Sequence, residues 1–145
     1  MSGRSEIALL VFGALLLLGA RRRKGGKGHK HVPPGGAPPG QVPTILSLAQ
    51  LRELAHAVGM AQPDVGAAIA MAESSGNTRA IGDKGNSIGL WQIHLPTAPK
   101  QWADRGMLMH AGFNAMAAKD MSAGGTNWNR WSAFKNKSYL AYMPK

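Results

Sequence analysis

The 145-residue sequence contains no cysteine, which excludes disulfide bonds, thiolate zinc sites and cysteine nucleophiles. Acidic side chains are also scarce: seven Asp and Glu stand against 17 Lys and Arg, a formal net charge of +10. Residues 1–43 hold seven of the basic side chains and one acid, whereas residues 44–145 hold ten and six. Because no aromatic side chain is interleaved with the cations of residues 21–30, we predict no nucleic-acid partner.

One long apolar stretch, residues 7–20, is followed at once by the cationic block RRRK at 21–24. As a helix it would measure about 21 Å at ~1.5 Å per residue, so spanning a ~30 Å bilayer core requires local thinning and snorkelling arginines. A cleaved signal peptide is the alternative, but the cations lie on the wrong flank for one. We predict a retained single-pass anchor over residues 1–24. The positive-inside rule then places the rest of the chain on the cytoplasmic side during synthesis.

The next segment, residues 25–43, is rich in glycine and proline and predicts a flexible linker without a packed core. Its two histidines, His29 and His31, have no further metal ligand near them, and the histidines beyond the linker show no ligand spacing. We therefore predict no metal site and no cofactor.

Residues 44–145 show helical spacing and predict one small, mainly α-helical domain. Ser47 and Gln50 form a capping box that starts a first helix, and Gly59 supplies its stop. Proline in the first turn predicts a second helix over residues 63–74.

The second half of this domain carries weaker helix signals. Residues 90–93 are a short apolar insert, either extended or a helical turn, after a loop rich in Gly, Asn and Ser. Further helices are expected over residues 98–105, from Asn114 as N-cap to about residue 123, and over residues 131–142.

Glu73 is the candidate catalytic residue. It follows Val65 by eight positions and Ile69 by four, so it continues the apolar stripe of the second helix. Partial burial disfavours the ionised carboxylate, and the negative end of the helix dipole disfavours it further. A protonated carboxyl is what a glycosidic oxygen needs from a general acid. The alternative is a solvent-exposed glutamate at a frayed helix end.

Two segments, AESSGN at 72–77 and SIGLWQI at 87–93, resemble the soluble lytic transglycosylase family, which is related in fold to goose-type lysozyme. In that family a Glu-Ser pair ends the catalytic helix, and a Gly-Leu-(Met or Trp)-Gln-Ile segment lines the sugar groove. The spacing from Glu73 to Gly89 agrees with the distance between these two motifs in that family. The resemblance covers about residues 45–143 and implies a small lysozyme-like fold.

Other features are most similar to the compact domains of bacteriophage wall-penetrating proteins. They are Trp91 in place of Met, the Asn-x-Arg-Ala pattern at 77–80, and the segments 113–115 and 128–134, which are similar to the closing part of those domains.

The resemblance implies cleavage of the β-1,4 bond between N-acetylmuramic acid and N-acetylglucosamine in peptidoglycan, without water. Glu73 would protonate the glycosidic oxygen and then, as base, help the 6-hydroxyl of the sugar to close a 1,6-anhydro ring. A water-using muramidase is the alternative and requires a second carboxylate. Asp83 is the best candidate for it, although an aspartate between Gly82 and Lys84 is also a common turn former.

The resemblance also implies a set of substrate-binding residues around Glu73. Alternatives remain for several of them: helix capping for the two serines, core packing for Trp91, and a purely structural polar role for Gln92. Phe134 stands where the family has a site tyrosine, and Tyr139 or Tyr142 is a candidate replacement. The full set is Ser74, Ser75, Ser87, Gly89, Leu90, Trp91, Gln92, Ile93, Phe134 and Tyr139.

The predicted membrane orientation favours a viral over a cellular protein. A domain held on the cytoplasmic side cannot reach the wall of its own host, whereas a virion that carries this membrane can present it at the next infection. The sequence thus predicts a single-pass protein of a bacteriophage virion membrane, with peptidoglycan and other virion proteins as partners. The alternatives are a bacterial inner-membrane enzyme that faces the periplasm and a non-catalytic wall-binding protein.

Overall fold

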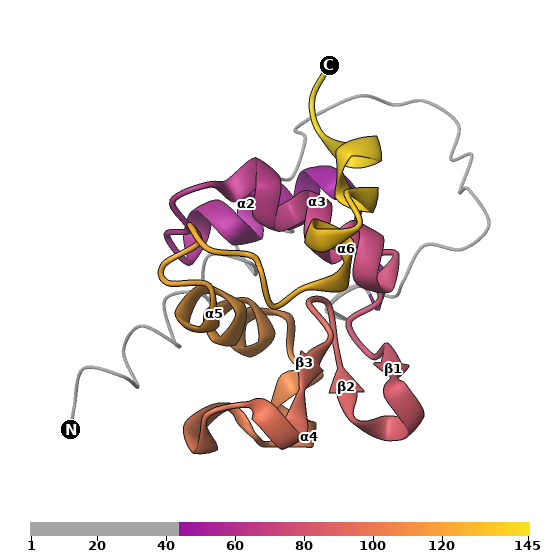
Figure 1. The fold of residues 1–145 in the computed structure, drawn as a ribbon, viewed down its shortest axis with the longest axis vertical. Coiled ribbons are helices and arrows are strands. Elements are labelled where there is room, and N and C mark those ends of the chain that lie inside the picture. Colours follow the sequence, from indigo (N-terminus) through magenta and orange to yellow (C-terminus); the bar gives the residue numbers. More distant parts are fainter. Residues whose placement is uncertain (1–43) are drawn as a thin grey trace, which may run out of the picture.

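The structure is a computed structural model and describes residues 44–145. The predicted anchor at 7–20, its basic flank and the linker at 25–43 lie outside the described residues. Among the residues that are described, no helix is long and apolar enough to cross a bilayer. The described part is mainly helical, as predicted, and it also contains a small β-sheet that the sequence did not predict (Figure 1).

The first two helices confirm the sequence signals. Helix α2 (Leu48–Ala57) begins with a complete capping box, in which the Ser47 side chain accepts from Gln50 N and the Gln50 side chain accepts from Ser47 N. It ends before Gly59, whose φ of +75° is the left-handed conformation typical of a helix stop. Helix α3 (Pro63–Ser74) has the expected proline in its first turn.

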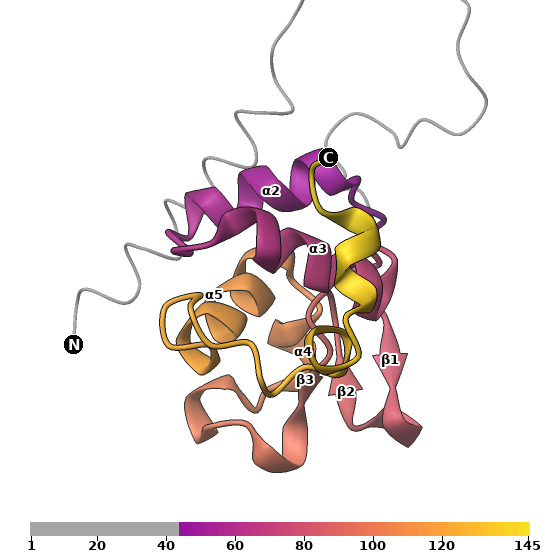
Figure 2. The same cartoon turned by 45° about the horizontal axis from the view of Figure 1, so that its top comes forward.

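Helix α3 is the centre of the domain. Its residues from Gly66 to Ala70 are all buried, because α2 packs on one side while α6 and the C-terminal η4 pack on another (Figures 1 and 2). Small side chains allow this close packing: a Cβ on Gly66 would lie 2.7 Å from Met60 Sδ. Glu73 follows this buried stretch, in the last turn of α3.

The sheet has three two-residue antiparallel strands in the order β1 (Ile81–Gly82), β2 (Ser87–Ile88) and β3 (Ile93–His94). Ser87 in the middle strand is opposite Gly82 on one side and His94 on the other. Left-handed residues reverse the chain after the first two strands, including Asp83 (φ 47°) between β1 and β2 and Gln92 (φ 45°) between β2 and β3.

The prediction of a helix over residues 98–105 is wrong. The structure has one short turn there, η3 (Lys100–Trp102), preceded by η2 (Leu95–Thr97) and followed by the four-residue helix α4 (Arg105–Leu108). Pro96 and Pro99 explain the difference, because proline lacks an N–H donor and restricts the residue before it.

Two further helices differ from the prediction in their bounds. Helix α5 (Ala111–Met121) starts three residues before Asn114, so Asn114 lies inside the helix and is not its N-cap. The single helix predicted over 131–142 is two pieces, α6 (Ser132–Lys135) and η4 (Ser138–Tyr142), separated by Lys137 in a left-handed conformation (φ 64°).

Candidate active site

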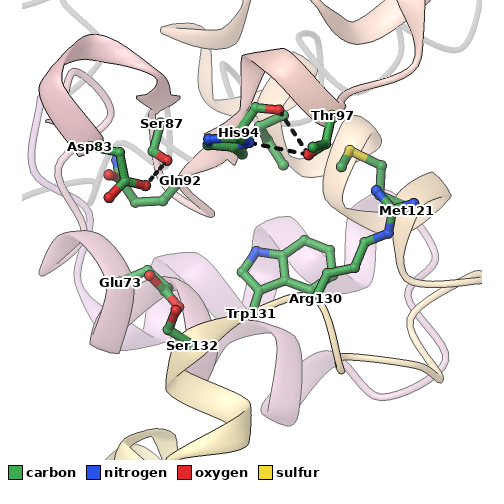
Figure 3. Close-up of a pocket in the computed structure, with 11 residues that line it drawn as sticks. Glu73, Asp83, Ser87, Gln92, His94, Thr97, Met121, Arg130, Trp131 and Ser132 are labelled. Carbon is green, nitrogen blue, oxygen red and sulfur yellow. Dashed lines mark hydrogen bonds between the residues drawn. The ribbon is translucent and has the colours of Figure 1, made fainter.

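A pocket of about 540 Å³ opens between the end of α3, the small sheet and the segment that leads into α6 (Figure 3). Within residues 44–145 no three His, Asp or Glu side chains are grouped so that they could hold a metal ion. The pocket is lined by Glu73, Asp83, Ser87, Gln92, Ile93, His94, Thr97, Met121, Arg130, Trp131 and Ser132.

Glu73 lies in the last turn of α3 and is half-buried. Its Oε1 accepts a hydrogen bond of 2.8 Å from the backbone N–H of Ala133, which is 60 residues further along the chain. Within the described part of the chain its second oxygen, Oε2, makes no hydrogen bond. The carboxyl group is therefore fixed through one oxygen, and the other remains available in the pocket.

Asp83 and Ser87 form the wall across from Glu73 (Figure 3). Ser87 is only 3% exposed, and its hydroxyl donates to Oδ2 of Asp83. Asp83 itself is exposed and sits in the left-handed turn between β1 and β2. A non-glycine residue in this backbone region is strained, and such strain persists where the surrounding structure fixes the turn. The hydroxyl of Ser87 thus holds a second carboxylate at the pocket.

Gln92 also lines the pocket, but its amide nitrogen makes both of its hydrogen bonds to the backbone. Nε2 donates to Gly89 O at 2.9 Å and to Ala80 O at 3.2 Å. Its amide therefore ties the turn after β2 to the segment before β1. It positions the wall on which Ser87 lies, and only Oε1 is left to bind a ligand.

Asn114 of α5 holds the turn between β2 and β3, a role that the sequence did not predict. Its side chain is fully buried, and its Oδ1 accepts from Trp91 N at 2.9 Å. Its Nδ2 donates to Ile88 O at 2.9 Å and to Leu108 O at 2.8 Å. An amide in the middle of an alanine-rich helix was the only sequence signal for such a buried polar anchor.

The predicted site residues divide into two groups. Glu73, Ser87, Gln92 and Ile93 come together at the pocket, although they belong to different elements. The others lie outside its lining: Ser74, Ser75, Gly89, Leu90, Trp91, Phe134 and Tyr139.

Leu90 and Trp91 belong to the core. Both are 0% exposed, and the Trp91 ring nitrogen donates to Gly66 O at 2.9 Å. A fully buried ring has no surface to offer a sugar, so Trp91 matches the core-packing alternative, and Leu90 likewise supports the pocket from the core. Trp91 O in turn accepts from the ring nitrogen of Trp131 at 2.7 Å, which fixes the wall formed by Trp131.

Gly89 is required for the packing of the turn that follows β2. Its φ is +77°, and a Cβ there would collide with the Asn114 amide and with Leu108 O. Ser75 matches the capping alternative, because it is the left-handed C-cap of α3, whereas Ser74 Oγ donates to Ala70 O at 2.9 Å within the helix.

Phe134 and Tyr139 stack on each other, with ring centroids 5.2 Å apart and an interplanar angle of 25°. Both are half-buried and pack against the core. The stacked pair thus joins α6 to η4, and Phe134 directly follows Ala133, whose N–H binds Glu73.

Sequence reasoning missed six lining residues, namely His94, Thr97, Met121, Arg130, Trp131 and Ser132. They lie in or just after β3, at the end of α5, or just before and at the start of α6, and only the tertiary fold brings these segments beside Glu73. Trp131 and Ser132 lie in a segment that the sequence did single out, but nothing in the pattern showed which of its side chains reach the pocket.

A family model described as a lysozyme-like domain matches residues 52–133, more than half of the chain. The chain belongs to this lysozyme-like family. The matched region begins in α2 and ends at Ala133, so it contains both Glu73 and the N–H group that binds it. No curated protein and no solved structure matched the chain. Membership of the lysozyme-like family indicates a peptidoglycan-acting lytic enzyme that cleaves glycosidic bonds.

Proposed function

We propose that this lysozyme-like enzyme is a peptidoglycan lytic transglycosylase, which cleaves the β-1,4 bond after N-acetylmuramic acid and leaves a 1,6-anhydro end. The observation that carries the proposal is the setting of Glu73 on the pocket wall, with Oε1 fixed by Ala133 N–H at 2.8 Å. A carboxyl group held in this way can present its other oxygen to the glycosidic bond in one orientation, which general acid catalysis requires.

The reaction then needs one carboxyl group and no water. The proton on Glu73 Oε2 moves to the glycosidic oxygen as the bond from that oxygen to C1 of the muramoyl sugar breaks. Positive charge develops at C1, and the pocket's carboxylates stabilise it. The 6-hydroxyl attacks C1, and Glu73, now the base, accepts the hydroxyl proton. The 1,6-anhydro ring is closed, and Glu73 is again protonated for the next cycle.

A water-using muramidase is the second candidate, because one specific observation favours it. Asp83 lines the same pocket as Glu73, and its carboxylate accepts a hydrogen bond from the buried Ser87. A carboxylate across the scissile bond from the general acid is the group that activates water in inverting glycosidases.

Product analysis separates these functions. The full-length chain in neutral detergent is incubated with purified peptidoglycan, and the released fragments are analysed by mass spectrometry. Anhydro-muramoyl ends, lighter by one water than reducing ends, are expected from the transglycosylase. Reducing ends would favour the muramidase and Asp83. A folded protein that binds peptidoglycan and releases neither product would favour a non-catalytic wall-binding role.

For localisation, we propose that residues 7–20 anchor the enzyme in a membrane and that the enzyme is carried by a bacteriophage virion. The support is the sequence alone: an uninterrupted apolar stretch followed by RRRK. Protease protection in expressing cells tests the orientation. Resistance of the catalytic domain in intact spheroplasts is expected, and digestion of the domain from the periplasmic side would contradict it.

A further inference from the structure

The charged side chains of the pocket are unevenly distributed. Glu73 and Asp83 occupy one end, whereas Arg130 lies at the other beside Met121 and Thr97 (Figure 3). The mechanism proposed above uses only the acidic end, so it leaves Arg130 without a role.

The backbone around Arg130 is held firmly although the side chain is exposed. Trp128 and Trp131 flank the turn that carries it, and they are only 1% and 5% exposed. Their rings pack edge to face with centroids 5.0 Å apart, and Trp131 N donates to Trp128 O at 3.0 Å. The two tryptophans are buried, whereas Asn129 and Arg130 between them are exposed, and Arg130 lines the pocket.

The guanidinium of Arg130 does not bind another group of the described domain. Over residues 44–145 it makes no hydrogen bond or ion pair. Arg79 is also exposed, but it is not part of the pocket lining. The position of Arg130 therefore suits a ligand bound in the pocket and not the stability of the fold.

The chemistry of the proposed substrate indicates what this ligand is. The amino sugars of an intact glycan strand are neutral, because the muramic acid carboxyl is taken up in the amide bond to the peptide stem. Free carboxylates are found on the peptide stems. The acidic end of the pocket repels them, whereas a guanidinium can bind a carboxylate with two parallel hydrogen bonds.

We infer that Arg130 is a specificity residue that binds a carboxylate of the peptide stem, so that the pocket selects glycan whose stems carry free carboxylates. This inference rests on the proposed action on peptidoglycan. The bound carboxylate also sets the direction of the strand, since the stem side must lie toward Arg130 while the glycosidic bond lies at Glu73.

Binding measurements test the inference independently of turnover. Soluble glycan fragments with peptide stems are divided into two samples, and the carboxylates of one are converted to neutral methylamides with carbodiimide and methylamine. Their affinities are measured by titration calorimetry with full-length Glu73→Gln protein in neutral detergent, with and without Arg130→Gln. Arg79→Gln is the matched control, because it removes an exposed arginine outside the pocket.

The expected preference for free carboxylates is about three- to tenfold, the range for a charge-assisted contact at a partly exposed site. Arg130→Gln should abolish the preference, Arg130→Lys should retain part of it, and Arg79→Gln should leave it intact. High salt should weaken it. Equal affinity for both samples, absence of binding, or an unchanged preference in Arg130→Gln would overturn the inference. Failure of the proposed reaction would appear separately, as absence of anhydro products from the unmutated chain.

Discussion

Replacing Asn114 with alanine should destabilise the domain strongly, because this buried amide holds the turn between β2 and β3. The change removes the partner of one backbone N–H and of two backbone carbonyls, at distances of 2.8–2.9 Å. A typical internal hydrogen bond contributes about 1 kcal/mol, and a buried group left unpaired costs about 1–3 kcal/mol. Even at about 1 kcal/mol for each of the three bonds, the loss is about 3 kcal/mol, a large part of the ~5–15 kcal/mol that stabilises a typical domain.

Urea unfolding of the full-length chain in neutral detergent, followed by tryptophan fluorescence, measures this loss. The matched control is Asn129→Ala, because Asn129 is exposed and should change the unfolding free energy by less than about 0.5 kcal/mol. A loss below about 1 kcal/mol for Asn114→Ala would refute the argument that the amide is the anchor of the turn. Peptidoglycan cleavage should fall as well, because Gln92 in the turn and Ser87 in the preceding strand both line the pocket.

Two further substitutions test the support of the pocket walls. Gly89 and Gly124 have nearly the same φ, +77° and +76°, but a Cβ on Gly89 collides with Asn114, whereas one on Gly124 meets nothing within 4 Å. Both alanine variants should show backbone strain. In the same urea experiment, Gly89→Ala should lower the free energy of unfolding by about 1–3 kcal/mol more than Gly124→Ala does. Equal losses in the two variants would contradict the collision. Trp131→Phe removes the 2.7 Å bond to Trp91 O and should cost about 1–3 kcal/mol; an unchanged melting temperature would show that this bond is dispensable.

The sequence predicted the elements whose signals are local. The capping box at Ser47 and the proline at the start of α3 gave two helices with correct bounds, because these signals act within one turn of the chain. The same local reasoning failed over residues 98–105, where it gave too little weight to Pro96 and Pro99.

The pocket was predictable only in part, because its walls come from distant segments. Helical spacing singled out Glu73, and the resemblance singled out the segment at 87–93. Neither could show that Ala133 donates to Glu73, since 60 residues separate them. The pattern also could not distinguish side chains that line the pocket from those beneath it, so Trp91 was predicted equally for both places and lies in the core.

The most direct test of the central claim is the rate at which full-length Glu73→Gln releases anhydro-muropeptides from purified peptidoglycan. Glutamine retains an oxygen that can accept from Ala133 N–H, so the variant should fold with nearly unchanged stability while lacking the acidic proton. A loss of at least about 10²-fold is predicted, with Glu53→Gln, an exposed glutamate on α2, as the unchanged control. Release of anhydro products by Glu73→Gln at close to the normal rate would contradict the account, because another group would then have to be the acid.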